Sequence, residues 1–282
     1  MTTRIRLLLA QLSPYVGDKE RNLRRLEEVV KGSGADIAVF PELYLTGYMA
    51  KDLLYRLAID PYHSSEMGFV KRVSQETGTA VIFGAPVRSN RGFIYNAMIA
   101  VDGDRVEVYY KRHLPTFSVF DEARWFRPHR GRLRLWTIRG VGVGPAICYD
   151  MFFPEIYKAY TLLGARILVT ISASPDSSLP LFHALSVARA VENTSFVVWV
   201  NTVGIYEGLG FAGGSRLVAP LGSVVAQLAL RREEVRVVEI DLSEVDRARR
   251  ARPVVRDSFI EDAEALLEAY KEFEGWSGSK HW

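Results

Sequence analysis

Hydrophobic residues along the chain fall into short continuous runs separated by stretches in which they recur at helical spacing. The continuous runs predict buried strands at residues 5–12, 35–40 and 79–87. Residues 19–31 place Leu23, Leu26 and Val30 on one helical face and are followed by Gly32, which predicts an amphipathic helix. The same patterns predict further strands at 93–101, 105–111, 133–138, 141–147, 165–171, 196–201, 217–219, 224–228 and 235–240, and further helices at 66–75, 154–164, 181–193 and 257–274.

A short internal echo links the two halves of the chain. In the first half a helix is followed by Gly34-Ala35-Asp36-Ile37 and an apolar strand, and in the second half a helix is followed by Gly164-Ala165-Arg166-Ile167 and another apolar strand. If the echo is structural, it implies two similar halves, each contributing a sheet and two helices. The fold class that follows is α/β.

Length and composition indicate one soluble domain. At 282 residues and 48% hydrophobic content the chain can bury a full core, and we expect a single domain over 1–282. The first apolar run is broken by Gln11, Ser13 and Pro14, which argues against a signal peptide, and no run approaches the roughly 20 apolar residues of a membrane span. With one cysteine, which cannot form an intrachain disulfide, this predicts the cytoplasm. The scarcity of Asn and Gln hints at a thermophilic source.

Two segments resemble phosphate or nucleic-acid binders only superficially. The glycine-rich segment 208–215 predicts a loop, but it lacks the lysine and the following helix that a P-loop requires. The basic run 247–256 has no aromatic stacking residues, and a solvated helix end before Pro253 explains it better than a DNA-binding arm. The net charge of +3 is small, so we expect no nucleic-acid partner.

Cys148 is the first candidate for chemistry. It follows the strand 141–147, and Pro154 then favours the first turn of a helix. A thiol at such a strand-to-helix turn lies near backbone N–H groups, a setting that lowers a cysteine pKa. The alternative remains open at this point, because a lone cysteine in an apolar run is more often an inert hydrophobe.

Two other strands end in charged side chains. Glu42 follows the strand 35–40, and Lys111 ends the strand 105–111, so a thiol, a carboxylate and an ammonium could meet at one edge of a sheet. Taken alone, Glu42 would be interpreted as a solvated loop residue. The five histidines have no metal-ligand spacing with each other or with Cys148, so we expect no metal site.

These segments together resemble the nitrilase (carbon–nitrogen hydrolase) superfamily over nearly the whole chain. Its blocks are matched by Phe40-Pro41-Glu42, by 111–115 (Lys-Arg-His-Leu-Pro) and by 147–150 (Ile-Cys-Tyr-Asp), with further matches at 188–193 and 213–215. The resemblance implies a four-layer α-β-β-α sandwich, no cofactor and assembly into homodimers or larger homo-oligomers. It also implies that Glu42 is the base, Lys111 the oxyanion stabiliser, Cys148 the nucleophile and Glu122 a supporting glutamate.

The branch within the superfamily stays open. Segments 47–54 and 114–122 look like the glutaminase domain of glutamine-dependent NAD synthetases, but Tyr149 stands where that branch usually has Glu, and Phe117 where it has Tyr. The motifs Cys-Tyr-Asp at 148–150 and Phe-Pro-Glu at 153–155 are instead similar to those of ω-amidases and carbamoylases. Candidate substrate-binding residues are Tyr48, Phe117, Tyr149 and Ser174. The acidic residues best placed to replace the missing Glu are Asp121, Glu122, Asp150 and Glu207.

The leading functional hypothesis is a hydrolase that cleaves a non-peptide C–N bond of a small linear amide or carbamoyl compound through a cysteine thioester, releasing ammonia. The alternative is a stand-alone glutaminase subunit that supplies ammonia to a separate synthetase, such as an NAD synthetase. A non-enzymatic binding scaffold is a third reading, and the intact Glu, Lys and Cys set argues against it. Residues 257–282, a helix with an aromatic tail, are expected to contact another subunit.

Overall fold

The apolar runs of the first half assemble with one strand from the C-terminal part of the chain, β14, into a six-stranded sheet. The computed structural model describes residues 3–277. Strand order in this sheet is β14-β1-β2-β3-β4-β5. The central strands β1, β2 and β3 are parallel to one another, and the others pair antiparallel. The bounds are β1 Arg4–Gln11, β2 Ile37–Val39, β3 Ala80–Arg88, β4 Ile94–Asp102, β5 Arg105–Tyr110 and β14 Glu234–Asp241.

The second half builds a matching sheet. Its order is β13-β12-β9-β8-β7-β6, again with three parallel strands, β7, β8 and β9, at its centre. The two sheets therefore repeat the same plan, as the internal echo predicts, although the first sheet takes β14 from the second half of the chain. The bounds are β6 Trp136–Ile138, β7 Val141–Ile147, β8 Ile167–Ser172, β9 Phe196–Asn201, β12 Arg216–Val218 and β13 Val224–Gln227.

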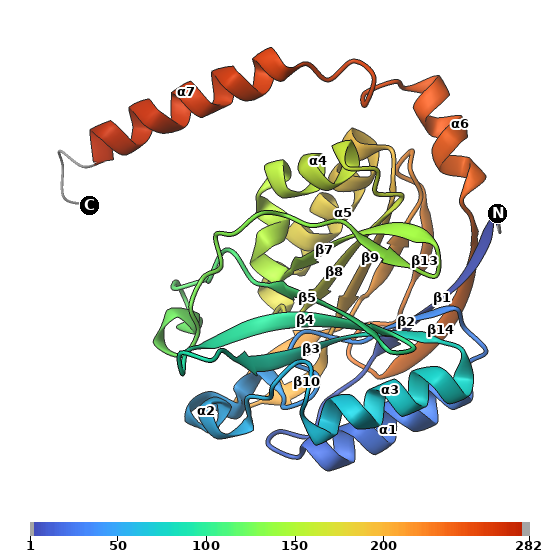
Figure 1. Ribbon diagram of the computed structural model, residues 1–282, viewed down its shortest axis with the longest axis vertical. Coiled ribbons are helices and arrows are strands. Elements are labelled where there is room, and N and C mark those ends of the chain that lie inside the picture. The colour runs from blue at the N-terminus through green and yellow to red at the C-terminus, as the bar shows by residue number, and fades with distance from the viewer. Residues whose placement is uncertain (1–2, 278–282) are drawn as a thin grey trace.

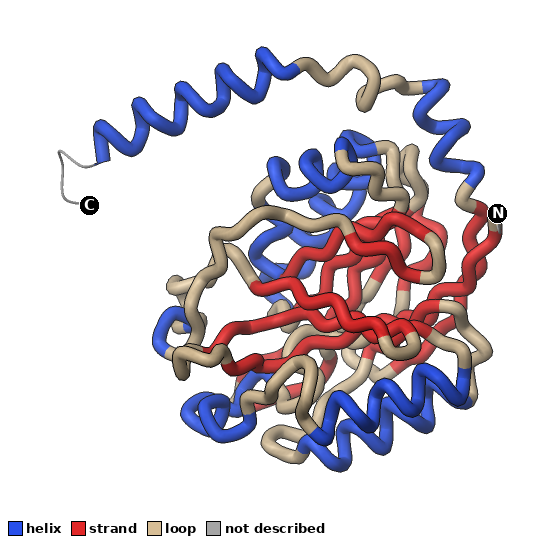
Figure 2. The backbone as a smooth tube through the Cα atoms, viewed as in Figure 1, coloured by secondary structure: helices blue, strands red, loops and turns tan. Residues whose placement is uncertain are grey.

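Helices cover the outer face of each sheet, which gives the four-layer α-β-β-α sandwich (Figures 1 and 2). Helices α1 (Lys19–Lys31) and α3 (Ser65–Thr77) cover the first sheet, and α4 (Pro154–Leu162) and α5 (Leu179–Asn193) cover the second. Strand β1 shows why both faces are apolar. Leu7 and Leu9 join the core shared with the second sheet, whereas Leu8 and Ala10 pack in the core under α1 and α3. The expected fold class is confirmed.

The sequence pattern predicted a loop for the glycine-rich segment 208–215, but the structure forms a strand within it. Residues β11 Leu209–Ala212 pair antiparallel with β10 Val203–Tyr206 in a separate two-stranded hairpin. The prediction was wrong because it gave the glycines more weight than Phe211. This side chain is fully buried, and its packing holds the strand in place. Short helical turns complete the chain: η1 Tyr48–Leu53, α2 Leu54–Leu57, η2 Glu122–Arg124, η3 Cys148–Phe152 and η4 Asp176–Ser178.

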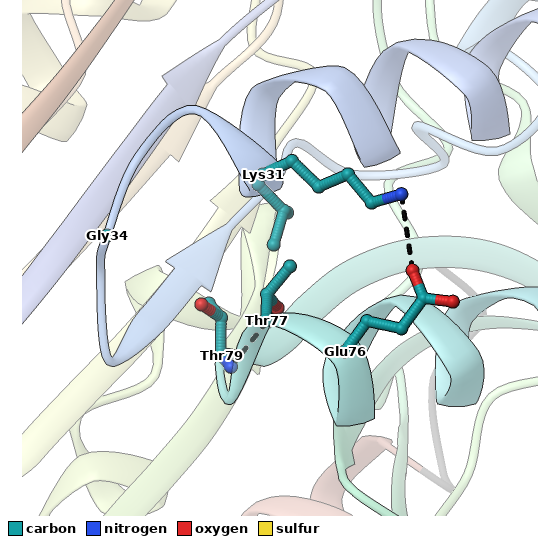
Figure 3. A pocket seen from close by; sticks show the side chains of 6 residues that line it. Lys31, Gly34, Glu76, Thr77 and Thr79 are labelled. Carbon is teal, nitrogen blue, oxygen red and sulfur yellow. Dashed lines mark hydrogen bonds and ion pairs between the residues drawn. The ribbon is translucent and has the colours of Figure 1, made fainter.

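The ends of α1 and α3 enclose a hollow of about 400 Å³ (Figure 3). Lys31 Nζ reaches across it to Glu76 Oε2 at 3.2 Å. At its base the Thr79 hydroxyl donates to the Ala35 carbonyl at 2.8 Å, and the Thr77 hydroxyl accepts from the Thr79 N–H at 3.3 Å. Because its polar side chains already have partners, this hollow is a packing feature where the two helices end.

The C-terminal segment leaves the sandwich. After α6 (Ser243–Ala251) the chain turns into α7 (Ile260–Ser277), which stands away from the sheets (Figure 1). Residues 259–275 are all exposed. Most of the aromatic tail, Trp276 to Trp282, for which a subunit contact was expected, lies outside the described residues. No helix within residues 3–277 combines the length and the apolar character needed to cross a bilayer.

Gly84 fixes the loop that carries Glu42. The Gly84 N–H donates to the Pro41 carbonyl at 3.1 Å, and the Gly84 carbonyl accepts from Leu45 N–H at 3.0 Å. A Cβ at position 84 would lie 2.2 Å from the Leu43 nitrogen and 2.7 Å from the Glu42 Cα. Only glycine lets β3 and this loop approach so closely, because both obstructing atoms belong to the backbone.

We therefore expect Gly84→Ala to lower the unfolding free energy by at least about 2 kcal/mol and to displace Glu42, since the loop must move to admit the methyl group. Gly68→Ala is the matched control. Gly68 is exposed within α3, and its added Cβ would meet nothing within 4 Å, so this variant should gain about 0.5–1 kcal/mol. Denaturant unfolding of both variants tests this, and a Gly84→Ala protein as stable as the parent would contradict it.

Candidate active site

Three strand ends bring ionisable side chains together in the interior. Glu42 lies in the loop that follows β2, Lys111 directly follows β5, and Cys148 directly follows β7. Glu42 and Lys111 are fully buried, and Cys148 is 5% exposed. Lys111 Nζ donates to Glu42 Oε1 at 2.7 Å and to Glu122 Oε1 at 2.7 Å. The structure thus joins Glu42, Lys111 and Glu122, which the sequence had only placed at separate strand ends and in a loop.

Glu42 is held at both oxygens by groups that the sequence analysis did not identify. Asn96 Nδ2 donates to Oε1 at 2.7 Å, and the backbone N–H of Ala173 donates to Oε2 at 2.7 Å. Asn96 lies on β4 and is fully buried. A lone amide within the apolar run 93–101 was the signal that could have found it, because a buried amide needs a partner. These contacts fix the direction in which the carboxylate points.

Cys148 occupies a strained turn. Its φ is 47°, in the left-handed region that residues other than glycine seldom adopt. In the parallel pairing of β7 with β8, Ile147 lies opposite Ile171, which brings Ser172 beside Cys148. The abrupt turn after β7 lifts the thiol out of the strand, toward the charged groups.

The strand-to-helix turn by itself favours a lowered thiol pKa, but the surrounding fold has the opposite effect. Burial raises the pKa of Cys148 well above its usual range, and the charge of Glu42 raises it further. The Lys111 ammonium and the Ser172 hydroxyl act in the opposite sense but do not outweigh burial. The local pattern pointed to nearby N–H groups, whereas the fold encloses the sulfur and sets carboxylates near it. A thiol with so high a pKa is protonated at neutral pH.

Lys111 and Glu122 respond differently to burial. Burial alone would lower the pKa of Lys111, but Glu122 and Glu42 outweigh it and raise that pKa, so Lys111 stays charged. Burial raises the pKa of Glu122 to about 7, although Lys111 acts against this. The Tyr48 hydroxyl donates to Glu122 Oε1 at 2.7 Å. Glu122 Oε2 is buried and has no hydrogen-bond partner among the described residues.

Asp150 ties the cysteine turn to the lysine strand. One of its oxygens accepts from the Tyr109 hydroxyl at 2.8 Å and from the Ile147 N–H at 3.2 Å, and the other accepts from the His113 N–H at 2.9 Å. Tyr109 and His113 lie on either side of Lys111, and Ile147 precedes Cys148. Asp150 is fully buried and occupied by these donors, so it does not face a substrate, for which the sequence analysis considered it.

Three candidate substrate-binding residues belong to one chain of contacting rings. We call Tyr149, Phe117, Phe120, Tyr48 and Phe211 the aromatic arc. Successive ring centroids along it are 5.2, 5.8, 6.3 and 6.3 Å apart. Tyr149 adjoins Cys148, and Tyr48 contacts Glu122, so the arc passes from beside Cys148 to Glu122 and on to Phe211.

Ser174, the fourth candidate, lies apart from the arc, just beyond β8. It is 1% exposed, and its hydroxyl has no hydrogen-bond partner in the described part of the chain. Its backbone N–H donates to Asn201 Oδ1 at 2.8 Å. Because the preceding residue, Ala173, binds Glu42, Ser174 follows the site directly along the chain.

Comparison with known proteins settles the family. Residues 6–250 match the family model described as carbon-nitrogen hydrolase. The chain belongs to the carbon–nitrogen hydrolase family. An (R)-stereoselective amidase from a Pseudomonas species is 34% identical over 258 residues, which cover 90% of this chain and 91% of that protein.

One further sequence relative and one solved structure are also similar to this carbon–nitrogen hydrolase. The glutamine-dependent NAD(+) synthetase of Aquifex aeolicus (strain VF5) is 33% identical over 87% of the chain, which spans only 44% of the synthetase. A solved carbon-nitrogen hydrolase from Helicobacter pylori G27 superposes with a TM-score of 0.85 at 22% identity, covering 94% of this chain and 98% of that one. That likeness concerns the fold.

The chemistry available to this carbon–nitrogen hydrolase comes from a thiol, two carboxylates and an ammonium. Between residues 3 and 277, no group of three or more His, Cys, Asp or Glu side chains is arranged to hold a metal ion. The buried ammonium supplies positive charge, and the carboxylates supply places for a proton. Such a set suits attack on a neutral carbonyl, where a proton must leave the nucleophile and negative charge must be stabilised.

The raised pKa of Glu122 predicts how the stability of the folded protein depends on pH. A carboxyl whose pKa rises from 4.5 to about 7 on folding contributes stability that is fully present below about pH 4.5 and is lost as the pH rises through about 7. The melting temperature of the wild type minus that of Glu122→Gln should therefore fall across this window. Glu239→Gln removes an exposed carboxylate and controls for the lost charge. A difference that rises with pH would refute the assignment.

Proposed function

We propose that this carbon–nitrogen hydrolase cleaves the C–N bond of a small linear amide through a thioester on Cys148, releasing ammonia. The observation that carries the proposal is the Lys111 ammonium held between Glu42 and Glu122, at 2.7 Å from each, in the buried interior beside the cysteine. Its relative the amidase, which matches this chain over almost the full length of both proteins, supports the same reaction class.

The first half of the reaction forms the thioester. Because the thiol is protonated at rest, Glu42 takes its proton as Sγ attacks the carbonyl carbon. Lys111 stabilises the oxyanion that develops on the carbonyl oxygen. Glu42 then passes the proton to the nitrogen, the C–N bond breaks, and ammonia leaves.

The second half hydrolyses the thioester. Glu42, now a carboxylate again, takes a proton from water as the water attacks the acyl carbon, and Lys111 again stabilises the oxyanion. The C–S bond breaks, the proton returns to sulfur, and the carboxylic acid leaves. Glu122 acts through Lys111, since it holds the ammonium on the side opposite Glu42.

The glutaminase alternative is weaker. The chain spans only 44% of the synthetase relative, and Tyr149 offers no charge where the glutaminase branch usually has Glu. A panel that compares ammonia release from glutamine, ω-amides of dicarboxylates, aliphatic amides and N-carbamoyl compounds separates the two functions. Glutamine as the best substrate by a clear margin would favour the glutaminase.

The covalent step gives a direct test. Incubation with the best amide of the panel, followed by acid quench and intact-protein mass spectrometry, should reveal an acyl adduct on Cys148. Cys148→Ala should form no adduct. Its kcat should fall by at least about 10³-fold, because no other group near the carbonyl replaces the nucleophile. Ser174→Ala, which removes a nearby hydroxyl, should keep the adduct. Turnover by Cys148→Ala at the wild-type rate would sink the proposal.

We also propose that the protein is a homodimer or a larger homo-oligomer and that α7 lies in the subunit contact. This helix exposes large apolar side chains that a monomer would leave in water: Ile260, Leu266, Leu267, Tyr270 and Phe273. It also borders an open groove of about 710 Å³ beside α4.

Light scattering at micromolar concentration should therefore give at least twice the mass of one chain. Leu267→Glu combined with Phe273→Glu should shift the mass toward one chain, because two charges would have to be buried in the contact. Leu53→Glu changes a comparably exposed leucine outside α7 and should leave the mass unchanged. A wild-type mass of a single chain would contradict the assembly.

A further inference from the structure

A second cavity lies at the far end of the aromatic arc. Its volume is about 230 Å³, and it is lined by Asp176, Gly204, Ile205, Gly210, Phe211 and Arg231. Phe211 belongs to both the cavity and the arc, whose other end is Tyr149, next to Cys148. Asp176 begins η4, three residues beyond Ala173, whose N–H holds Glu42. The cavity thus shares Phe211 with the arc, and its Asp176 is close along the chain to the backbone N–H that holds Glu42.

The Asp176 carboxylate is incompletely paired. Its Oδ1 is buried and has no hydrogen-bond partner in the described residues. Its Oδ2 lies 3.4 Å from the Arg231 guanidinium; the side chain of Arg231 is 77% exposed and that of Asp176 is 37% exposed. A buried carboxylate oxygen without a donor is unfavourable, and an exposed arginine at this distance is a weak, solvent-screened partner. The carboxylate can therefore accept a better donor.

The surroundings of the carboxylate favour a small cation. A Cβ on Gly210 would lie 3.1 Å from Asp176 Oδ2, so the glycine leaves space at the oxygen that a side chain would fill. Phe211 supplies an aromatic ring on the same cavity, and an ammonium is attracted both to aromatic faces and to a carboxylate. An anionic group would instead meet the charge of Asp176.

We infer that this cavity is a specificity subsite for the ammonium group at the far end of an amide substrate. The inference rests on the proposed amide hydrolysis and narrows it to linear amides that carry a terminal amine. The amide carbonyl would lie at Cys148, the aliphatic chain would run from the site toward Phe211, and the ammonium would donate to Asp176. The sequence analysis missed Asp176, because it considered other acidic residues as substitutes for the missing glutamate.

The test compares pairs of amides that differ only in the terminal group. δ-Aminovaleramide and hexanamide have the same number of heavy atoms, and a methyl group in the second replaces the ammonium of the first. Shorter and longer homologous pairs report which chain length reaches the subsite. The measured quantity is the ratio of kcat/KM for the ammonium compound to that for its methyl counterpart. We expect this ratio to be roughly ten- to a hundredfold at the best length.

Three variants test whether this ratio of kcat/KM values depends on the Asp176 carboxylate. Asp176→Asn should lower it by at least roughly tenfold, because the charge-assisted hydrogen bond is lost. Arg231→Ala should raise it, since the competing cation is removed. Glu207→Gln takes one negative charge from the turn between β10 and β11, where Glu207 pairs with Lys51, and should change the ratio by less than about twofold. Equal losses in Asp176→Asn and Glu207→Gln would overturn the subsite.

Failure of the hydrolase proposal can be told apart from failure of the subsite. If neither series is hydrolysed, calorimetric binding of δ-aminovaleramide to Cys148→Ala, with and without Asp176→Asn, decides the question. Binding that Asp176→Asn weakens at least roughly tenfold supports the subsite without the reaction. No binding, or equal binding by both proteins, overturns it, as does hydrolysis of both series with no preference for the ammonium.

Discussion

The ion pairs of Lys111 are the interaction on which the centre of the molecule depends. Two carboxylates, Glu42 and Glu122, are buried within 2.7 Å of one ammonium, and without it they would repel each other in a medium that screens poorly. Removing one partner from such a buried set leaves an uncompensated charge, which costs more than the pair contributes. The lysine is thus a structural ion as well as a chemical group, and the two roles cannot be separated by a simple deletion.

Much of the surrounding fold serves to hold this lysine opposite the cysteine. Asp150 gathers donors from both sides of Lys111 and from the residue before Cys148, so the two sheets are fastened where their reactive groups meet. Burial then keeps the thiol protonated. Because the thiolate is the species that reacts with oxidants and electrophiles, this burial protects the only cysteine of the chain from both.

The sequence predicted the features that depend on neighbouring residues. Apolar runs located the strands, and the three motif blocks located Glu42, Lys111 and Cys148 at their ends. The contacts that orient those residues join distant parts of the chain, such as Ala173 to Glu42 and Asp150 to Tyr109, and no local pattern encodes them. The thiol pKa could not be predicted for the same reason, since burial depends on the whole fold. The β10–β11 hairpin escaped notice because its glycines outweighed one buried phenylalanine.

The left-handed backbone at Cys148 sets the cost of each side chain that could stand there. At a φ of 47° residues other than glycine are strained, and a β-branched side chain is more restricted than an unbranched one. Thr194, with a φ of 44°, shows that the fold can still hold a β-branched residue in this region. A change from cysteine to serine therefore adds no branch at this turn, whereas threonine there would be held only at a cost in stability.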